Sequence, residues 1–406
     1  MSFLSKLIRK GHLYYKRNVL RNVRWVAITG SVGKSTTSAL ISAVLSCRGQ
    51  VVDGTVVSRS NTDELVDHTV LAVGRQHRYC VIELSIGPRL REIAQFLRPH
   101  VGVVTNIASD HRSKYKSLEN IARVKSEVIR ALGDDGVAIL NADDPLVWGM
   151  RGLAPGKVIG FGRSPSATLQ VESATGEWPN RMTVQLKHGA RTLDVKTRFL
   201  GDYAALPVAA ALAVGLAQGI RLEDGAAAIA AVEPVEGRLR PSETSDGVMF
   251  IDNSWKTPYH ILPNVFQLLS QAKAKRKIIV LGSISDYPGS TSSRYRSVAR
   301  QALKVADLVV FVGRWGGSLA KLQEATESGR LLTFIDTRSA RDGLRMILRH
   351  GDLVLLQGSQ RRDHLERILL DRLQTVSCWR ADCGRLQRCL QCPMFEQSGE
   401  PHFAEI

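Results

Sequence analysis

The stretch that decides the fold is Thr29-Gly30-Ser31-Val32-Gly33-Lys34-Ser35-Thr36. Apolar residues 25–28 precede it, and residues 37–47 follow it with apolar side chains at helical spacing. A strand, a glycine-rich loop and a helix in this order are typical of a phosphate-binding loop, where backbone N–H groups and the positive helix end face phosphate oxygens. Lys34 would contact the β- and γ-phosphates, and Ser35 would bind Mg²⁺. We predict that a nucleotide is bound by Gly30, Ser31, Val32, Gly33, Lys34, Ser35 and Thr36.

The loop is a compact variant of this motif. Only two residues separate Gly30 from Gly33, whereas the usual loop has four residues between its first glycine and the Gly-Lys pair. The alternative interpretation is an ordinary glycine turn followed by a solvent-exposed Lys34.

Length and charge limit the class of protein. A chain of 406 residues is long enough for two or three domains. Its net charge of +17 comes from Lys and Arg along the whole chain, which favours an anionic substrate or an acidic polymer. Nucleic acid is a less favoured partner, because no zinc-finger, RRM or helix-turn-helix pattern is present. No apolar run reaches about 18 residues, so we expect no membrane span.

Residues 1–24 carry seven Lys or Arg and no acidic residue. These basic residues alternate with apolar ones, so the segment could be an amphipathic helix on a membrane surface or on a partner protein. It could equally be a helix packed on the first domain. The basic residues interrupt every apolar run, so the segment does not resemble a secretory signal.

Strands and helices alternate after the glycine loop. Strands are predicted at 79–82, 101–105 and 136–140, with helices at 90–97 and 118–132 between them. This order predicts a parallel sheet with right-handed crossovers, which binds ligands at the carboxyl ends of its strands. Three polar side chains lie at or just after strand ends, namely Ser35, Glu83 and His111. Each alone is more often structural, but together with the glycine loop they suit Mg²⁺.

A different pattern follows residue 166. Short alternating strands between 167 and 199 predict a small antiparallel insert, and helices at 202–218 and 223–232 lead to a linker at 234–241. A second α/β unit then has strands at 248–251, 277–281, 308–312, 331–335 and 353–356, with helices at 293–305 and 340–348 for example. It lacks the dinucleotide glycine fingerprint, so NAD binding is not predicted.

Several motifs together resemble the Mur ligases. They are the glycine loop, Glu83-Leu84-Ser85, Thr105-Asn106-Ile107 with Asp110-His111, Lys125, Leu140 to Asp144, Gly237-Arg238, Ile251 to Ser254, Val280 to Ser283, and Gln357-Gly358-Ser359. The set covers roughly residues 25–370 and is more specific than any single motif. It is most similar to the branch that adds D-Ala–D-Ala to the peptidoglycan precursor.

The resemblance implies an α/β fold with two main domains. A P-loop-containing central ATPase domain with a parallel sheet would span 25–235, and a C-terminal Rossmann-like domain would span 236–375. The basic segment 1–24 and a cysteine-rich tail 376–406 would flank them. The implied activity is ATP-dependent amide bond formation between a carboxylate and an amine through an acyl phosphate.

The resemblance also implies roles for single residues. Lys34 would hold the phosphates, and Ser35 with Glu83 would bind a first Mg²⁺. A second Mg²⁺ would involve His111 and Lys125, the position that family members carbamylate. Lys34, Lys125 and His111 would thus be the catalytic residues. The predicted contacts to the nucleotide outside the loop are Asn141, Arg238 and Asp252.

This sequence departs from the family in three places. Only about 24 residues precede the ATPase domain, so the domain that grips the UDP-sugar has no counterpart, and a UDP-MurNAc peptide is not favoured as substrate. The stretch His-Asn-x-x-Asn near the adenine reads Tyr203 to Pro207 here, which affects nucleotide preference. Residues 253–258 replace an Asn-rich run beside the acceptor site. We expect the carboxylate to belong to an amino acid, a peptide or an amino-acid-bearing metabolite.

The tail contains Cys378, Cys383, Cys389 and Cys392 in the spacing C-x₄-C-x₅-C-x₂-C. Four thiolates could hold Zn²⁺, which we favour, or an iron–sulfur cluster. They could also be free thiols. ATP chemistry implies the cytoplasm, where disulfides are rare. The other two cysteines, Cys47 and Cys80, lie in apolar segments and are expected to be buried.

Two further hypotheses belong to other classes. The chain could be a nucleotide-binding regulator or scaffold that is derived from a Mur ligase and has lost ligation, because the adenine and acceptor segments depart from the family. The net charge alone would also allow a nucleic-acid-binding protein.

Overall fold

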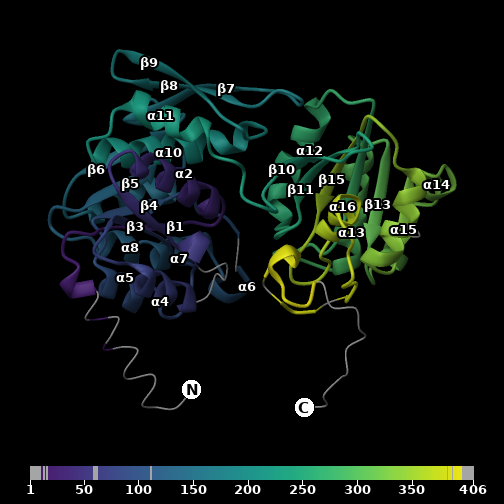
Figure 1. Ribbon diagram of the computed structural model, residues 1–406, viewed down its shortest axis with the longest axis horizontal. Coiled ribbons are helices and arrows are strands. Elements are labelled where there is room, and N and C mark those ends of the chain that lie inside the picture. Colours follow the sequence, from purple (N-terminus) through teal and green to yellow (C-terminus); the bar gives the residue numbers. More distant parts are fainter. Residues whose placement is uncertain are drawn as a thin grey trace. The chain divides into compact units, whose positions relative to one another are not determined.

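The computed structural model describes residues 11, 14, 17–57, 63–109, 112–319, 321–381, 383–385 and 387–395. The described chain forms two compact units, each built on its own β-sheet (Figure 1). The first unit takes the chain up to Gly176 together with Asn180–Glu233. The second takes Glu177–Pro179 and the chain from Pro234 onward. None of the described helices has the length and apolar character needed to span a bilayer.

The first unit contains a nine-stranded sheet in the order β2-β3-β1-β4-β5-β6-β7-β8-β9. The strands from β2 to β7 are parallel, and β8 and β9 add antiparallel pairs. The antiparallel strands expected between 167 and 199 are therefore present, but they continue this sheet and do not form a separate insert. The strands are β1 Arg24–Thr29, β2 Gln50–Asp53, β3 His77–Glu83, β4 Val101–Val104, β5 Val137–Asn141, β6 Val158–Gly162, β7 Leu169–Thr175, β8 Thr183–His188 and β9 Arg191–Lys196.

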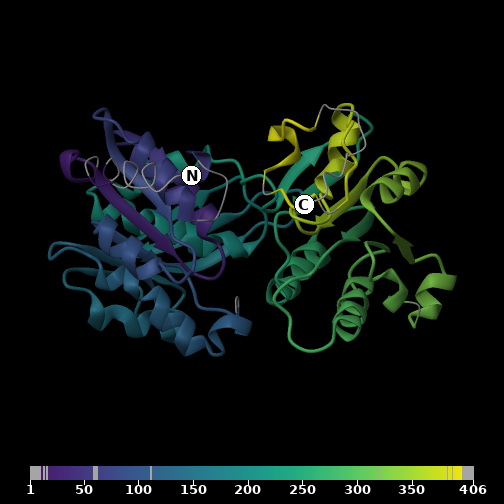
Figure 2. The same ribbon diagram turned by 90° about the horizontal axis from the view of Figure 1, so that it is seen from below.

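Helices cover both faces of this sheet (Figures 1 and 2). Alternate residues of a strand point to opposite faces, so Val26 and Ile28 of β1 pack with α2 and α10, while Trp25 and Ala27 pack with α4 and α5. The helices are α2 Lys34–Ser46, α3 Gly54–Val57, α4 Asp63–Ala72, α5 Leu90–Leu97, α6 Arg112–Tyr115, α7 Leu118–Lys125, α8 Glu127–Arg130, α9 Pro145–Trp148, α10 Ala205–Ala217 and α11 Leu222–Ala230, with 3₁₀ turns at Gly149–Leu153 and Asp202–Ala204.

The second unit contains a six-stranded sheet in the order β10-β11-β15-β12-β13-β14. Only β10 is antiparallel to its neighbour. The strands are β10 Arg240–Glu243, β11 Met249–Asn253, β12 Arg276–Leu281, β13 Leu308–Val312, β14 Leu331–Phe334 and β15 Asp352–Gln357. The helices are α12 Leu262–Gln271, α13 Thr291–Leu303, α14 Gln323–Glu327, α15 Thr337–Ile347 and α16 Glu366–Leu373, with 3₁₀ turns at Tyr259–Ile261, Gly316–Leu319 and Cys389–Gln391.

One buried carboxylate joins the ends of two central strands in the second unit. Asp363 accepts hydrogen bonds from the Ser283 N–H and hydroxyl, both at 2.6 Å, and from the Ser359 N–H at 2.9 Å. Ser283 follows β12 and Ser359 follows β15. A Cβ on Gly282 would lie 2.4 Å from Asp363 Oδ2, so this position must be glycine. Asp363 thus links the turns that contain the two Gly-Ser motifs of the sequence, Gly282-Ser283 and Gly358-Ser359.

The structure corrects some expectations. The helix predicted over 118–132 is two helices, because the chain turns at Ser126 between α7 and α8. Cys47 caps the C-terminus of α2 and is exposed, so its predicted burial is wrong, whereas Cys80 is buried in β3. The linker predicted over 234–241 runs into β10 at Arg240.

The close approach at Gly282 predicts a local stability defect. Gly282→Ala should lower the free energy of unfolding of the second unit by about 1–3 kcal/mol, because the new methyl group displaces the Asp363 carboxylate from both turns. Urea unfolding followed by hydrogen exchange of β12 and β15 peptides measures it. Gly317→Ala is the matched control, because no atom lies within 4 Å of its added Cβ. Equal urea midpoints for the two variants would contradict the assigned role of Asp363.

Candidate active site

The residues that follow β4 hold the glycine loop in place. The Asn106 side-chain amide contacts both backbone polar groups of Val32. Its Oδ1 accepts from the Val32 N–H at 2.9 Å, and its Nδ2 donates to the Val32 carbonyl at 3.1 Å. Thr105 Oγ1 donates to the same carbonyl at 2.8 Å. A Cβ on Gly30 would lie 1.9 Å from Thr105 Oγ1, and Gly30 has a positive φ of 145°. Only glycine fits there, so the loop shape is fixed by the protein itself.

The loop ends at the N-terminus of α2. Gly33 adopts the left-handed conformation with φ 84°, and Lys34 is the first helical residue. The first backbone N–H groups of a helix have no acceptor within the helix and carry partial positive charge, which makes them a site for phosphate oxygens. The residues present therefore fit the phosphates of a nucleoside triphosphate.

Two lysine ammonium groups contact one carbonyl oxygen of the loop. Lys34 Nζ donates to the Gly30 oxygen at 2.8 Å, and Lys125 Nζ donates to the same oxygen at 2.8 Å. Lys125 is fully buried at the end of α7, although a helical lysine is usually exposed to solvent. This arrangement places two cationic side chains beside the loop, close to the first N–H groups of α2, which would face a phosphate.

The other predicted site residues of the first unit follow neighbouring strands. Glu83, at the end of β3, is 2% exposed and pairs in register with Ile28 of β1. Asn141, at the end of β5, donates to the Thr105 carbonyl at 2.8 Å and accepts from the Asp143 N–H at 2.9 Å. Ser35 is the second residue of α2. The oxygens of Ser35 and Glu83 fit Mg²⁺ in kind. Their roles as ligands, and the contact of Asn141 to the nucleotide, stay predictions. His111 lies outside the described residues.

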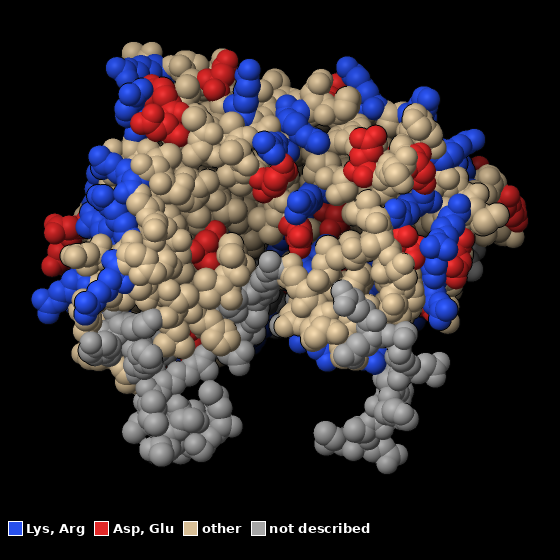
Figure 3. Space-filling model, in the orientation of Figure 1, with Lys and Arg blue, Asp and Glu red and all other residues tan. Residues whose placement is uncertain are grey.

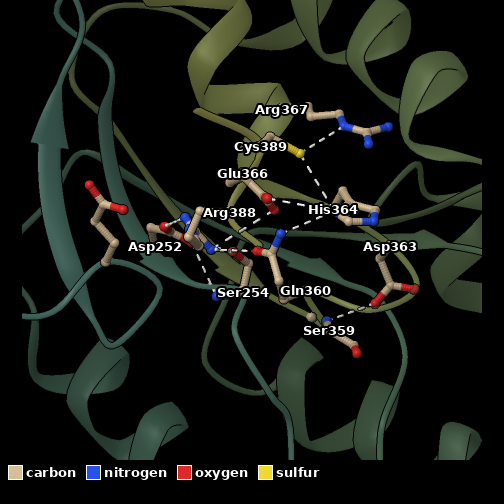
Figure 4. A network of polar contacts seen from close by, with 12 residues as sticks. Asp252, Ser254, Ser359, Gln360, Asp363, His364, Glu366, Arg367, Arg388 and Cys389 are labelled. Carbon is tan, nitrogen blue, oxygen red and sulfur yellow. Dashed lines mark hydrogen bonds and ion pairs between the residues drawn. The ribbon is translucent and has the colours of Figure 1, made fainter. Parts of the chain in front are cut away.

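In the second unit, the predicted nucleotide contact Asp252 is part of a buried ion pair (Figure 4). Its Oδ2 accepts from Arg388 Nη2 at 2.5 Å, and its Oδ1 accepts from the Ser254 N–H at 3.1 Å and the Ser254 hydroxyl at 2.5 Å. Arg238 places its guanidinium over the Trp255 ring, 5.8 Å from the ring centroid.

The ion pair continues into a polar network that sequence reasoning missed. Arg388 Nη1 also donates to Gln360 Oε1 at 2.9 Å, and Gln360 Nε2 lies 3.2 Å from His364 Nδ1 (Figure 4). The buried carboxylate of Glu366 lies 4.0 Å from Arg388. Burial favours its protonated form, but the Arg388 guanidinium and then His364 outweigh burial and hold the pKa of Glu366 below its usual range. One indication of this network was present in the sequence, because Arg388 lies among the tail cysteines, directly before Cys389.

The four tail cysteines line one small cavity of about 10 Å³, together with His364 and Arg367. Cys383 Sγ lies 2.9 Å from His364 Nε2, and Arg367 Nε donates to Cys389 Sγ at 3.1 Å. Among the described residues, the ligand atoms of His364, Glu366 and Cys389 lie within 4.8 Å of one another. The structure thus brings the predicted cysteines to a single place, and adds a histidine that the spacing did not indicate.

Comparison with known proteins agrees with this geometry. Residues 28–215 match the family model described as the Mur ligase middle domain. The chain is 29% identical over 359 residues to the UDP-N-acetylmuramoyl-tripeptide–D-alanyl-D-alanine ligase of Mycobacterium tuberculosis (strain CDC 1551 / Oshkosh), covering 82% of this chain and 70% of that protein. The chain is therefore similar to the Mur ligases over most of its length.

Other Mur ligases are similar over comparable lengths. The Escherichia coli (strain K12) enzyme with the same name is 28% identical over 350 residues, covering 83% of this chain and 74% of that protein. A crystal structure of MurF from Acinetobacter baumannii has a TM-score of 0.81 at 24% identity and covers 91% of this chain and 80% of that chain. MurF ligase from Thermotoga maritima, in complex with ADP, has a TM-score of 0.72 at 20% identity, with 90% and 82% covered. The predicted resemblance to the Mur ligases and the α/β fold class are confirmed.

The buried position of Lys125 predicts that its amine is essential. Lys125→Ala should reduce ADP formation by about 100-fold or more, because it removes the charged group beside the Gly30 carbonyl. A coupled assay for ADP measures the loss. Arg123→Ala is the matched control, since Arg123 is exposed on the same helix. Equal activity of the Lys125→Ala variant and the wild type would show that this amine has only a structural role.

Proposed function

We propose that this protein is an ATP-dependent, ADP-forming ligase that joins a carboxylate to an amine. The observation that carries the proposal is the pair of ammonium groups, from Lys34 and Lys125, on the carbonyl of Gly30 within an intact phosphate loop. The named relatives are all ligases, which favours this function over a regulator or scaffold that has lost ligation.

The chemistry has two steps. A carboxylate oxygen of the substrate attacks the γ-phosphorus of ATP, the bond from that phosphorus to the bridging oxygen breaks, and ADP leaves. The amine then attacks the carbonyl carbon of the acyl phosphate, phosphate leaves, and the nitrogen loses one proton. Lys34 and the α2 amides would neutralise and position the phosphates. Mg²⁺, with Ser35, Glu83, His111 and the carbamylated form of Lys125 as proposed ligands, would supply further charge neutralisation at the transferred group.

The substrates are proposed at the level of class. The named relatives add D-alanyl-D-alanine to a UDP-linked tripeptide. For this chain we propose an amino acid, a peptide or an amino-acid-bearing metabolite as the carboxylate, and an amino acid as a suitable amine. The nucleotide preference differs in one respect, because Pro207 stands where the family has an amide side chain. A Cβ on Gly33 would lie 3.8 Å from Pro207 Cγ, so this apolar residue borders the loop.

An anionic partner is a further part of the proposal. Lys and Arg are interspersed with Asp and Glu on the face of both units drawn in Figure 3. In the first unit, Arg21, Arg24, Arg48 and Arg78 line an open hollow of about 430 Å³. Most of the basic N-terminal segment lies outside the described residues, and its binding to a membrane surface, an acidic polymer or a partner protein stays a prediction. We propose a cytoplasmic location, where ATP is present and thiols stay reduced.

The tail cysteines are proposed as ligands of a metal centre. Zn²⁺ is favoured and an iron–sulfur cluster is the alternative, because thiolates bind both. The shared cavity supports the proposal.

The proposed function is tested by ADP formation. A screen of amino acids and small carboxylates should give ADP only when both a carboxylate and an amine are present. With an active pair, Lys34→Ala should reduce ADP formation by at least about 100-fold, because the phosphates lose their main cationic contact. Lys196→Ala, an exposed change in β9, is the control. Amine-independent phosphate release, or normal turnover by the Lys34→Ala variant, would rule the ligase mechanism out.

A further inference from the structure

The cysteine segment is packed against two of the predicted nucleotide-binding elements. Arg388, adjacent in sequence to Cys389, pairs with Asp252 and also donates to Ser254 Oγ at 3.1 Å. The same guanidinium lies against Gly237, where an added Cβ would be 2.8 Å from Arg388 Nη1. Gln391 Nε2 donates to Glu236 Oε2 at 3.3 Å. Residues 388–391 therefore contact both the segment 236–237 and the end of β11.

A chain of contacts leads from the cavity to Asp252. Cys383 contacts His364, His364 contacts Gln360, and Gln360 accepts from Arg388. Gln360 also donates to the Gln387 carbonyl at 2.8 Å, so the segment before Arg388 is held as well. His364, Gln360 and Arg388 lie together in Figure 4. Whatever fixes the cysteines also fixes Arg388, since Cys389 is its covalent neighbour.

The electrostatics of the cavity favour a four-thiolate metal centre. Arg367, Arg380 and Arg385 line it together with the four cysteines. Three guanidinium groups oppose a site with net positive charge. Zn²⁺ bound by four thiolates has a net charge of −2, which these arginines compensate, and Arg367 already donates to Cys389 Sγ. The alternative set of His364, Glu366 and Cys389 would give a site with no net negative charge.

We infer that Zn²⁺, bound by Cys378, Cys383, Cys389 and Cys392, organises the tail as a clamp that holds Arg388 on Asp252 and on Gly237. On binding, the four thiols release their protons to solvent. Among the described residues only His364, Glu366 and Cys389 have their ligand atoms within 4.8 Å of one another, so the inference requires the other three sulfurs of this cavity to move toward Cys389. The clamp keeps Asp252 and the neighbouring Arg238 in the geometry required for nucleotide binding; this consequence rests on the proposed function.

The first test is the metal content of the full chain, measured by mass spectrometry of the elements after purification without a metal-affinity step. Wild type and Cys47→Ser should each hold one zinc per chain, because Cys47 is an exposed thiol of the first unit. The double variant Cys378→Ser/Cys392→Ser should lose the zinc. Absence of stoichiometric zinc in the wild type, or iron in its place, would overturn the inference.

The second test measures the effect of the clamp on residues 236–254 and on nucleotide binding, and it needs no carboxylate or amine substrate. Zinc removal, by the double variant or by a chelator, should increase hydrogen exchange of residues 236–254 and weaken AMP-PNP binding by about tenfold. Arg388→Met should keep the zinc and produce the same two changes, because the contacts of the guanidinium to Asp252, Ser254 and Gln360 are lost while all four cysteines remain. Unchanged exchange and affinity after zinc loss would overturn the clamp.

Failure of the proposed function gives a different result. In that case zinc-loaded wild type would form no ADP with any carboxylate and amine, whether or not it binds AMP-PNP, while zinc content and exchange of residues 236–254 would still report on the clamp. If the double variant does not fold, chelation of the wild type and return of Zn²⁺ provide the same comparison, and restored protection supports the inference.

Discussion

The carbonyl oxygen of Gly30 accepts hydrogen bonds from two lysine ammonium groups, and the active site depends on this contact. A carbonyl oxygen can accept two bonds, but it does not cancel two charges. Lys34 and Lys125 therefore bring two positive charges to the loop, where the oxygens of a bound phosphate would be negative. The protein holds the loop rigid through Thr105 and Asn106, and so fixes the position of both ammonium groups before a ligand arrives.

In the second unit the corresponding charged contact is an ion pair between Asp252 and the Arg388 guanidinium. Asp252 is buried at the end of β11. This pairing links a strand end to a segment that has little regular secondary structure of its own. Val376, Cys389 and Phe395 pack with Leu370 of α16 in a small apolar cluster. A metal centre would therefore add order where the apolar core is small.

Much of the fold could be predicted from the sequence. Helix 90–97 and strand 308–312 have the predicted bounds, because an amphipathic pattern and an uninterrupted apolar run are strong local signals. β2 escaped prediction because it has four residues and is only partly buried. β6 was not predicted either, because it contains two glycines within five residues, and glycine weakens the sequence pattern of a strand.

The candidate site was predictable in its motifs but not in its contacts. The glycine loop, Glu83 and the tail cysteines could be found from residue type and spacing. The burial of Lys125 could not, because it depends on a contact with a residue 95 positions away. The same holds for Arg388, which meets Asp252 across 136 positions. Such pairs are set by the tertiary fold and leave no local pattern.

The most direct test of the account is a crystal structure of the protein with Mg²⁺ and AMP-PNP. The account predicts that the β- and γ-phosphates lie on residues 30–36, and that Lys34 Nζ leaves the Gly30 carbonyl to contact them. Lys125 should then lie beside the metal or the γ-phosphate. Nucleotide bound elsewhere, with Lys34 Nζ still on the Gly30 oxygen, would contradict the account.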